Sequence, residues 1–162
     1  MRKVLAIGVL IVIGFILNTV ALFTTGWVAI DYVYKTQYIG IMPFQSGWQP
    51  SWFVTASWLM FISFFLSIIL CVAYSDAMRR IRHCGCSHSI RHSFNSISLI
   101  ATVVAIFEAV AFILTASNLN DRSFFYTSQV SLGYSSFLAL ASGIVYLVAS
   151  GMSQHVRHYD CC

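Results

Sequence analysis

The chain has 162 residues, of which 59% are hydrophobic and only 9% are charged, and its mean hydropathy is +0.80. Because about a quarter of the residues in a typical soluble domain are charged, this composition excludes an ordinary soluble protein and indicates a membrane protein. The net charge of +4 does not indicate a nucleic-acid-binding protein. The basic residues lie beside hydrophobic segments, where attraction to anionic membrane lipid explains them better.

Four apolar segments reach the length of roughly 20 residues that a bilayer-spanning helix needs. We therefore predict an all-α membrane protein, a left-handed bundle of four transmembrane helices in one domain, residues 1–162. The predicted spans are residues 4–28, 51–74, 95–117 and 130–150, with a cytoplasmic loop at 75–94 and a cytoplasmic tail at 151–162. A cleaved signal peptide is the less favoured alternative for the first span, because its apolar run is longer than a signal-peptide core.

The first span contains a polar pair, Asn18-Thr19, and ends at Trp27, where an aromatic side chain suits the membrane interface. The segment after it, residues 29–50, is rich in β-branched and aromatic residues. This pattern predicts a small extracellular two-stranded β-ribbon that turns near residues 35–37. An isolated hairpin is marginally stable in water, so the ribbon is expected to lean on the helix ends.

The polar segment between the second and third spans fixes the predicted orientation. Residues 76–94 carry four arginines, three histidines and two cysteines. Short basic loops stay on the cytoplasmic face. With this loop and both termini inside, seven basic residues are cytoplasmic and only Lys35 and Arg122 are outside. We therefore predict a multi-pass plasma-membrane protein whose two termini are cytoplasmic.

Glu108 is the one ionisable residue well inside a predicted span. At about 1.5 Å per helical residue, Glu108 and Asn18 lie at similar depths, so an intramembrane polar contact is expected at this level. One hypothesis is a neutral carboxyl group that forms hydrogen bonds inside the bundle, with Asn18 as a candidate partner. The alternatives are a coupling-ion site, a proton relay or a contact with a partner's membrane helix.

Small residues recur every four positions in the third and fourth spans, which predicts close helix packing along two stripes. The stripe residues are Ala101, Ala105 and Ala109, followed by Ser135, Ala139 and Gly143. The two stripes are expected in helix–helix contacts, and one arrangement packs them against each other.

The five cysteines all fall in the second span or on the predicted cytoplasmic side, where structural disulfides are disfavoured. Juxtamembrane cysteines beside basic residues are candidates for S-acylation, such as palmitoylation, which would add covalent acyl chains. These candidates are Cys84, Cys86, Cys161 and Cys162. Metal binding by Cys84, Cys86, His83 and His88, or unmodified thiols, are the alternatives. We expect no other cofactor, no catalytic residues and no enzymatic activity, because no catalytic set of side chains lies in a plausible site.

Several of these features resemble the claudin superfamily, which includes peripheral myelin protein 22 and the auxiliary γ subunits of calcium channels and AMPA receptors. The resemblance covers the whole chain in layout and is carried by Gly26-Trp27, by Gly40-Ile41-Met42 or Gly47-Trp48 in the first loop, and by the small-residue-rich fourth span. In that family, a Gly-Leu-Trp motif and two loop cysteines follow a tryptophan like Trp27. Here the motif is degenerate and both cysteines are missing.

The resemblance implies an auxiliary or assembly subunit that associates laterally with a channel, a receptor, another membrane protein or itself. The missing loop disulfide argues against paracellular sealing, so cell–cell adhesion or junction formation is the alternative function. A small channel ranks third.

Overall fold

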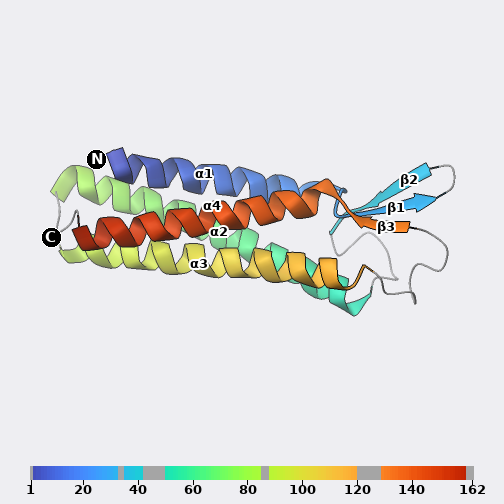
Figure 1. The fold of residues 1–162 in the computed structure, drawn as a ribbon. Coiled ribbons are helices and arrows are strands. Elements are labelled where there is room, and N and C mark those ends of the chain that lie inside the picture. The colour runs from blue at the N-terminus through green and yellow to red at the C-terminus, as the bar shows by residue number, and fades with distance from the viewer. Residues whose placement is uncertain (1, 33–34, 42–49, 85–87, 120–128, 160–162) are drawn as a thin grey trace.

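The computed structural model describes residues 2–32, 35–41, 50–84, 88–119 and 129–159. Its helices are α1 (Arg2–Phe23), α2 (Ser51–Cys84), α3 (His88–Ser117) and α4 (Tyr134–Tyr159). Its strands are β1 (Val28–Tyr32), β2 (Lys35–Ile39) and β3 (Gln129–Leu132). The helices form an elongated bundle with the small sheet at one end (Figure 1).

Each of the four helices is long and apolar enough to cross a membrane. The start of α1 and the end of α4 lie at the same end of the bundle, opposite the sheet (Figure 1). We call this the terminal end, and the opposite one the sheet end. The predicted fold of four apolar helices with a small β-structure is confirmed.

The bundle is packed unevenly around its circumference. Helix α3 packs extensively against both α2 and α4, and α1 packs extensively against α4. The contact between α1 and α2 is much smaller. The surface between these two helices, which we call the α1–α2 seam, is therefore the loosely packed side of the bundle.

The sheet has three antiparallel strands in the order β2-β1-β3, one strand more than the predicted ribbon. The third strand lies where the fourth span was expected to begin. Its polar and apolar residues alternate, a strand pattern that a hydropathy count merges with the apolar helix behind it. The predicted position of the turn is wrong, because Tyr32 pairs with Lys35 and residues 35–37 belong to β2.

The segment expected to be a polar loop, residues 75–94, is helical through Cys84 and again from His88. Its apolar residues explain the difference, because Ala77 and Phe94 are buried in the same cluster as Ile7 and Leu70. Helix α4 likewise continues through Tyr159, with Val156 buried in that cluster. The bundle core thus extends beyond the most hydrophobic segments at the terminal end.

Candidate functional site

Trp27 joins the bundle to the sheet. Its side chain is fully buried, and its indole Nε1–H donates a 2.5 Å hydrogen bond to the carbonyl oxygen of Ala21 in α1. Its backbone N–H donates to Ile39 O at 3.0 Å, and its carbonyl oxygen accepts from the Gly133 N–H at 2.9 Å. One residue therefore links the end of α1 to β2 and to the start of α4.

Two glycines allow the chain segments to meet at Trp27. A Cβ atom on Gly133 would collide with the carbonyl oxygen of Gly26, and one on Gly26 would collide with the ring of Tyr134. The contact is closed by the Ser135 N–H, which donates to Gly26 O at 2.9 Å, and by the hydroxyls of Thr24 and Ser135, 2.6 Å apart. We call residues 24–27 and 133–135 the Trp27 junction.

The end of β2 is fixed to α2 in a similar way. Gly40 and Ile41 are buried, and the Ser57 hydroxyl lies within hydrogen-bonding distance of both Ile41 O and Phe53 O, to which it donates its one hydrogen. Gly47 and Trp48, the other residues of the predicted loop motif, lie outside the described residues. The sheet is thus fixed to α1, α2 and α4 at once.

Glu108 lies fully buried in the centre of the bundle, but it does not contact Asn18 as expected. The Ser142 hydroxyl oxygen lies 3.3 Å from Glu108 Oε1 and 2.9 Å from the carbonyl oxygen of Gly14. Asn18 instead donates from Nδ2 to Ser63 Oγ at 3.3 Å. Equal depth did not predict the partner, because the rotation of each helix decides which neighbour a side chain faces.

The Ser142 geometry favours a neutral Glu108. The hydroxyl has one hydrogen to share between Gly14 O and Glu108 Oε1, and Glu108 Oε2 has no hydrogen-bond partner among the described residues. A protonated Glu108 would supply the second hydrogen for the contact with Ser142. An ionised carboxylate at this depth would be costly without a cationic partner, and the described residues place none on Glu108. Complete burial also keeps Glu108 away from any partner helix outside the bundle.

The predicted small-residue stripes lie where the helices approach closely. Ala101, Ala105, Ser135, Ala139 and Gly143 are buried, whereas Ala109 is half-buried. A Cβ on Gly143 would lie 3.4 Å from Glu108 Oε2 and 3.6 Å from Ala105 O, so the middle of one stripe faces the middle of the other.

Further contacts tighten the packed side. A Cβ on Gly14 would lie 2.9 Å from the ring of Tyr146, so α1 approaches α4 closely. Nearer the terminal end, Ser150 Oγ lies 2.8 Å from both Ser98 Oγ and Thr102 Oγ1. Such hydroxyl contacts help to hold membrane helices together, because apolar side chains contact lipid as favourably as they contact another helix.

The α1–α2 seam is filled by aromatic side chains instead. Phe64 of α2 stacks on Phe15 of α1 with ring centroids 5.8 Å apart, and it meets Phe23 edge-on at 5.7 Å. Phe65 extends the group at 5.8 Å from Phe64. Phe23 and Phe65 are 50% and 60% exposed, so this group of four rings, the aromatic face, reaches the surface of the bundle.

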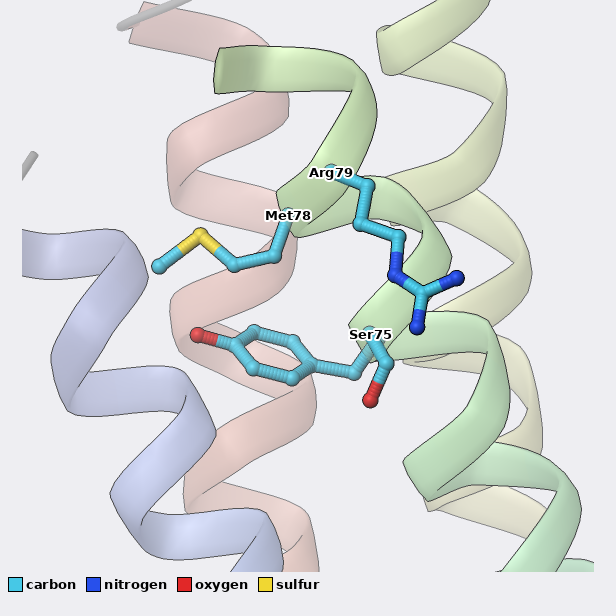
Figure 2. Close-up of a pocket in the computed structure, with 4 residues that line it drawn as sticks. Ser75, Met78 and Arg79 are labelled. Carbon is cyan, nitrogen blue, oxygen red and sulfur yellow. The ribbon is translucent and has the colours of Figure 1, made fainter.

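Towards the terminal end, the seam narrows at Tyr74. Its hydroxyl donates to Val4 O at 2.8 Å, and its ring occupies the space that a Cβ on Gly8 would need. A cavity of about 220 Å³ beside this ring is lined by Tyr74, Ser75, Met78 and Arg79. Figure 2 shows Met78 and Arg79 extending in opposite directions from α2 around it.

The model of one protein family, described as tight junction protein, claudin-like, matches residues 1–162. The chain belongs to this claudin-like family. No curated protein matches the sequence. The predicted claudin-like resemblance is therefore confirmed over the whole length, whereas the family does not distinguish an auxiliary role from a junctional one.

Within this claudin-like chain, the Trp27 junction holds the sheet without covalent help, because no cysteine occurs in residues 1–70 or 87–160. The sequence pointed to Trp27 and, as a member of a small-residue stripe, to Ser135, but not to Gly133 and Tyr134. The sequence pattern that could have identified them is a glycine directly before an apolar helix, at the position where the chain turns out of a strand.

The predicted acylation sites lie largely outside the described residues. Cys84 ends α2, although its side chain is not described, and Cys86, Cys161 and Cys162 fall outside. The alternative metal set shares Cys84 and Cys86, so the structure does not describe it either. Among the described residues, no group of histidine, cysteine and acidic side chains is arranged to hold a metal ion.

Proposed function

We propose that this claudin-like membrane protein acts as an auxiliary or assembly subunit that binds a channel, receptor or other integral membrane protein laterally. The aromatic face in the α1–α2 seam is the observation that supports this role. Three rings contact the ring of Phe64, and two of them, Phe23 and Phe65, are about half exposed on the side where the bundle itself is loosely packed.

Single exposed apolar side chains on a membrane helix need only lipid as a neighbour. A preassembled aromatic group differs, because its rings are already ordered by one another and lose little conformational freedom when a partner covers them. Aromatic residues also supply most of the energetic centres of protein interfaces. A partner helix lying along the seam would cover Phe23 and Phe65 together.

The burial of the polar side chains also supports the aromatic face as the surface that binds a partner. The contacts of Glu108 with Ser142 and of Asn18 with Ser63 lie inside the bundle, and both side chains are fully buried. A lateral partner would therefore recognise the shape of the aromatic face rather than an intramembrane charge.

The expected orientation places the terminal end in the cytoplasm and the sheet outside the plasma membrane. The excess of basic residues at the terminal end supports this orientation. In that arrangement, Cys84, Cys86, Cys161 and Cys162 would be open to S-acylation. Acyl-exchange mass tagging would show a shift for the wild type that a Cys→Ser variant of all four loses; no shift in the wild type would refute acylation.

A second candidate, cell–cell adhesion or junction formation, is favoured by the sheet end. The family description names tight junctions. Tyr38 and Tyr134 form an edge-on ring pair 6.4 Å apart, and each is 52% exposed. Held by the Trp27 junction, this tyrosine pair would form a rigid surface for a copy on a neighbouring cell.

Purification of the tagged protein in mild detergent, followed by mass spectrometry, tests the two roles. For the auxiliary role, we expect one channel, receptor or transporter in fixed stoichiometry. Phe65→Ala should weaken this association, whereas Phe137→Ala, an equally apolar change at a 53% exposed position of α4, should not.

The junctional role predicts different results in the same experiment. The protein would recover only itself and would concentrate at cell contacts, and Tyr38→Ala rather than Phe65→Ala would abolish that concentration. This outcome would overturn the auxiliary role.

A further inference from the structure

The cavity beside Tyr74 lies at the level where α2 leaves its apolar segment. Ser75, Asp76 and Arg79 follow directly after the apolar residues that end at Tyr74. Helix α1 begins beside this level, because Tyr74 donates to Val4 O. A cavity at this position would lie at the depth of phospholipid headgroups rather than in the hydrocarbon core.

The cavity walls differ in chemistry. Tyr74 is fixed against α1 by its hydrogen bond and by Gly8, and Met78 is half-buried, so these two form an apolar wall. Ser75 and Arg79 are exposed and form a polar wall. Figure 2 shows the Arg79 guanidinium on the side of the cavity away from Met78.

The surroundings carry net positive charge. Arg2 and Lys3 are exposed at the start of α1, and Arg79 and Arg80 are exposed on α2. Asp76 is the acidic residue nearest in sequence, and within the described residues it forms no ion pair with Arg79. The guanidinium is therefore available, and it presents a planar set of donors suited to the oxygens of a phosphate.

From the cavity towards the sheet end, α1 and α2 expose apolar side chains to the membrane. Leu5 on α1 and Val72 on α2 are each 60% exposed, and Ile69 is 52% exposed. A charged group in the cavity would thus lie near exposed apolar side chains of both α1 and α2. This combination matches a phosphate attached to hydrocarbon chains.

We propose that this cavity binds the phosphate headgroup of an anionic glycerophospholipid, with Arg79 contacting the phosphate and the acyl chains lying along the α1–α2 seam. Ser75 offers a hydroxyl to the headgroup, and Tyr74 and Met78 pack against the glycerol region. The lipid would fill the terminal end of the seam and support the weak α1–α2 contact. This inference does not depend on the auxiliary role.

The test uses the full chain in phosphatidylcholine vesicles with and without phosphatidylglycerol. We expect phosphatidylglycerol to raise the thermal unfolding midpoint of the wild type, and native mass spectrometry to detect a retained lipid. Arg79→Gln should weaken this binding about tenfold, the effect of losing one charge-assisted contact. Arg80→Gln, which removes the same charge one residue away without lining the cavity, should retain it.

Three outcomes would overturn the proposal. Equal weakening by Arg79→Gln and Arg80→Gln would show only diffuse attraction to a charged surface. Equal stabilisation by soluble glycerol phosphate would show a phosphate site that does not need the lipid. No dependence on phosphatidylglycerol in the wild type would exclude the site. The unfolding midpoint of Arg79→Gln in phosphatidylcholine alone should match the wild type, because Arg79 is exposed.

Discussion

The two sides of the bundle are built from different residues. Along the contacts of α4 with α1 and α3, glycine, alanine and serine let the backbones approach, and the polar groups of Glu108 and Ser142 are enclosed. Along the α1–α2 seam, large aromatic side chains separate the helices and reach the surface. The first side therefore encloses the contacts that maintain the fold, whereas the second exposes the surface on which our proposed lateral binding rests.

The largest effect is expected at the Trp27 junction, which fixes the packed side to the sheet. Gly133→Ala should prevent correct folding or cost more than about 4 kcal/mol, because the new Cβ meets the backbone carbonyl of Gly26. Thermal unfolding in detergent and the yield of monodisperse protein measure this loss of stability. Gly151→Ala is the control: nothing lies within 4 Å of that Cβ, and the helix should gain up to about 1 kcal/mol.

A smaller loss is expected within the packed side itself. Gly143→Leu should destabilise the protein by about 2–3 kcal/mol, because the side chain must displace Glu108 and the Ala105 backbone. Gly143→Ala should be tolerated, since its Cβ would make ordinary contacts at 3.4 Å and beyond. Unchanged yield and thermal stability of Gly143→Leu would show that the stripes do not pack closely.

Substitutions of Glu108 test whether its buried carboxyl group is neutral. Glu108→Gln keeps the size and a donor for Ser142, so its stability should stay within about 1 kcal/mol of the wild type. Glu108→Ala should cost about 2 kcal/mol, because it leaves a void and an unsatisfied hydroxyl. If Glu108→Gln were as damaging as Glu108→Ala, the group would act as an ion rather than as a neutral acid.

The smallest effect on stability is expected in the seam. Phe65→Ala should change the unfolding free energy by less than about 0.5 kcal/mol, because the side chain is 60% exposed. The same variant should lose the laterally bound partner in co-purification. A large loss of stability would place Phe65 among the residues that maintain the fold and would remove the contrast between the two sides.

The sequence was sufficient for the features that depend on composition and spacing. Long apolar segments predicted the four helices, and the four-residue repeats through Ala105 and Gly143 selected residues that face each other in the structure. Trp27 was selected as a residue at the exit of the first helix, and it lies at the centre of the sheet attachment.

Features that depend on three-dimensional arrangement were not predicted. The strand at residues 129–132 gains its partner from β1, about a hundred positions earlier, and the sequence near it resembles the start of a span. The aromatic face combines α1 and α2, and the pairing of Glu108 with Ser142 depends on helix rotation. None of these follows from a local pattern.

We propose that the α1–α2 seam, and not the packed side, binds partners in the membrane. Site-specific photo-crosslinking in native membranes tests it most directly, with a photoreactive phenylalanine analogue placed at the position of Phe65 or, as the matched control, of Phe137. We expect a discrete protein adduct from the Phe65 position and none from the Phe137 position. Adducts from Phe137 alone, or equally from both positions, would contradict it.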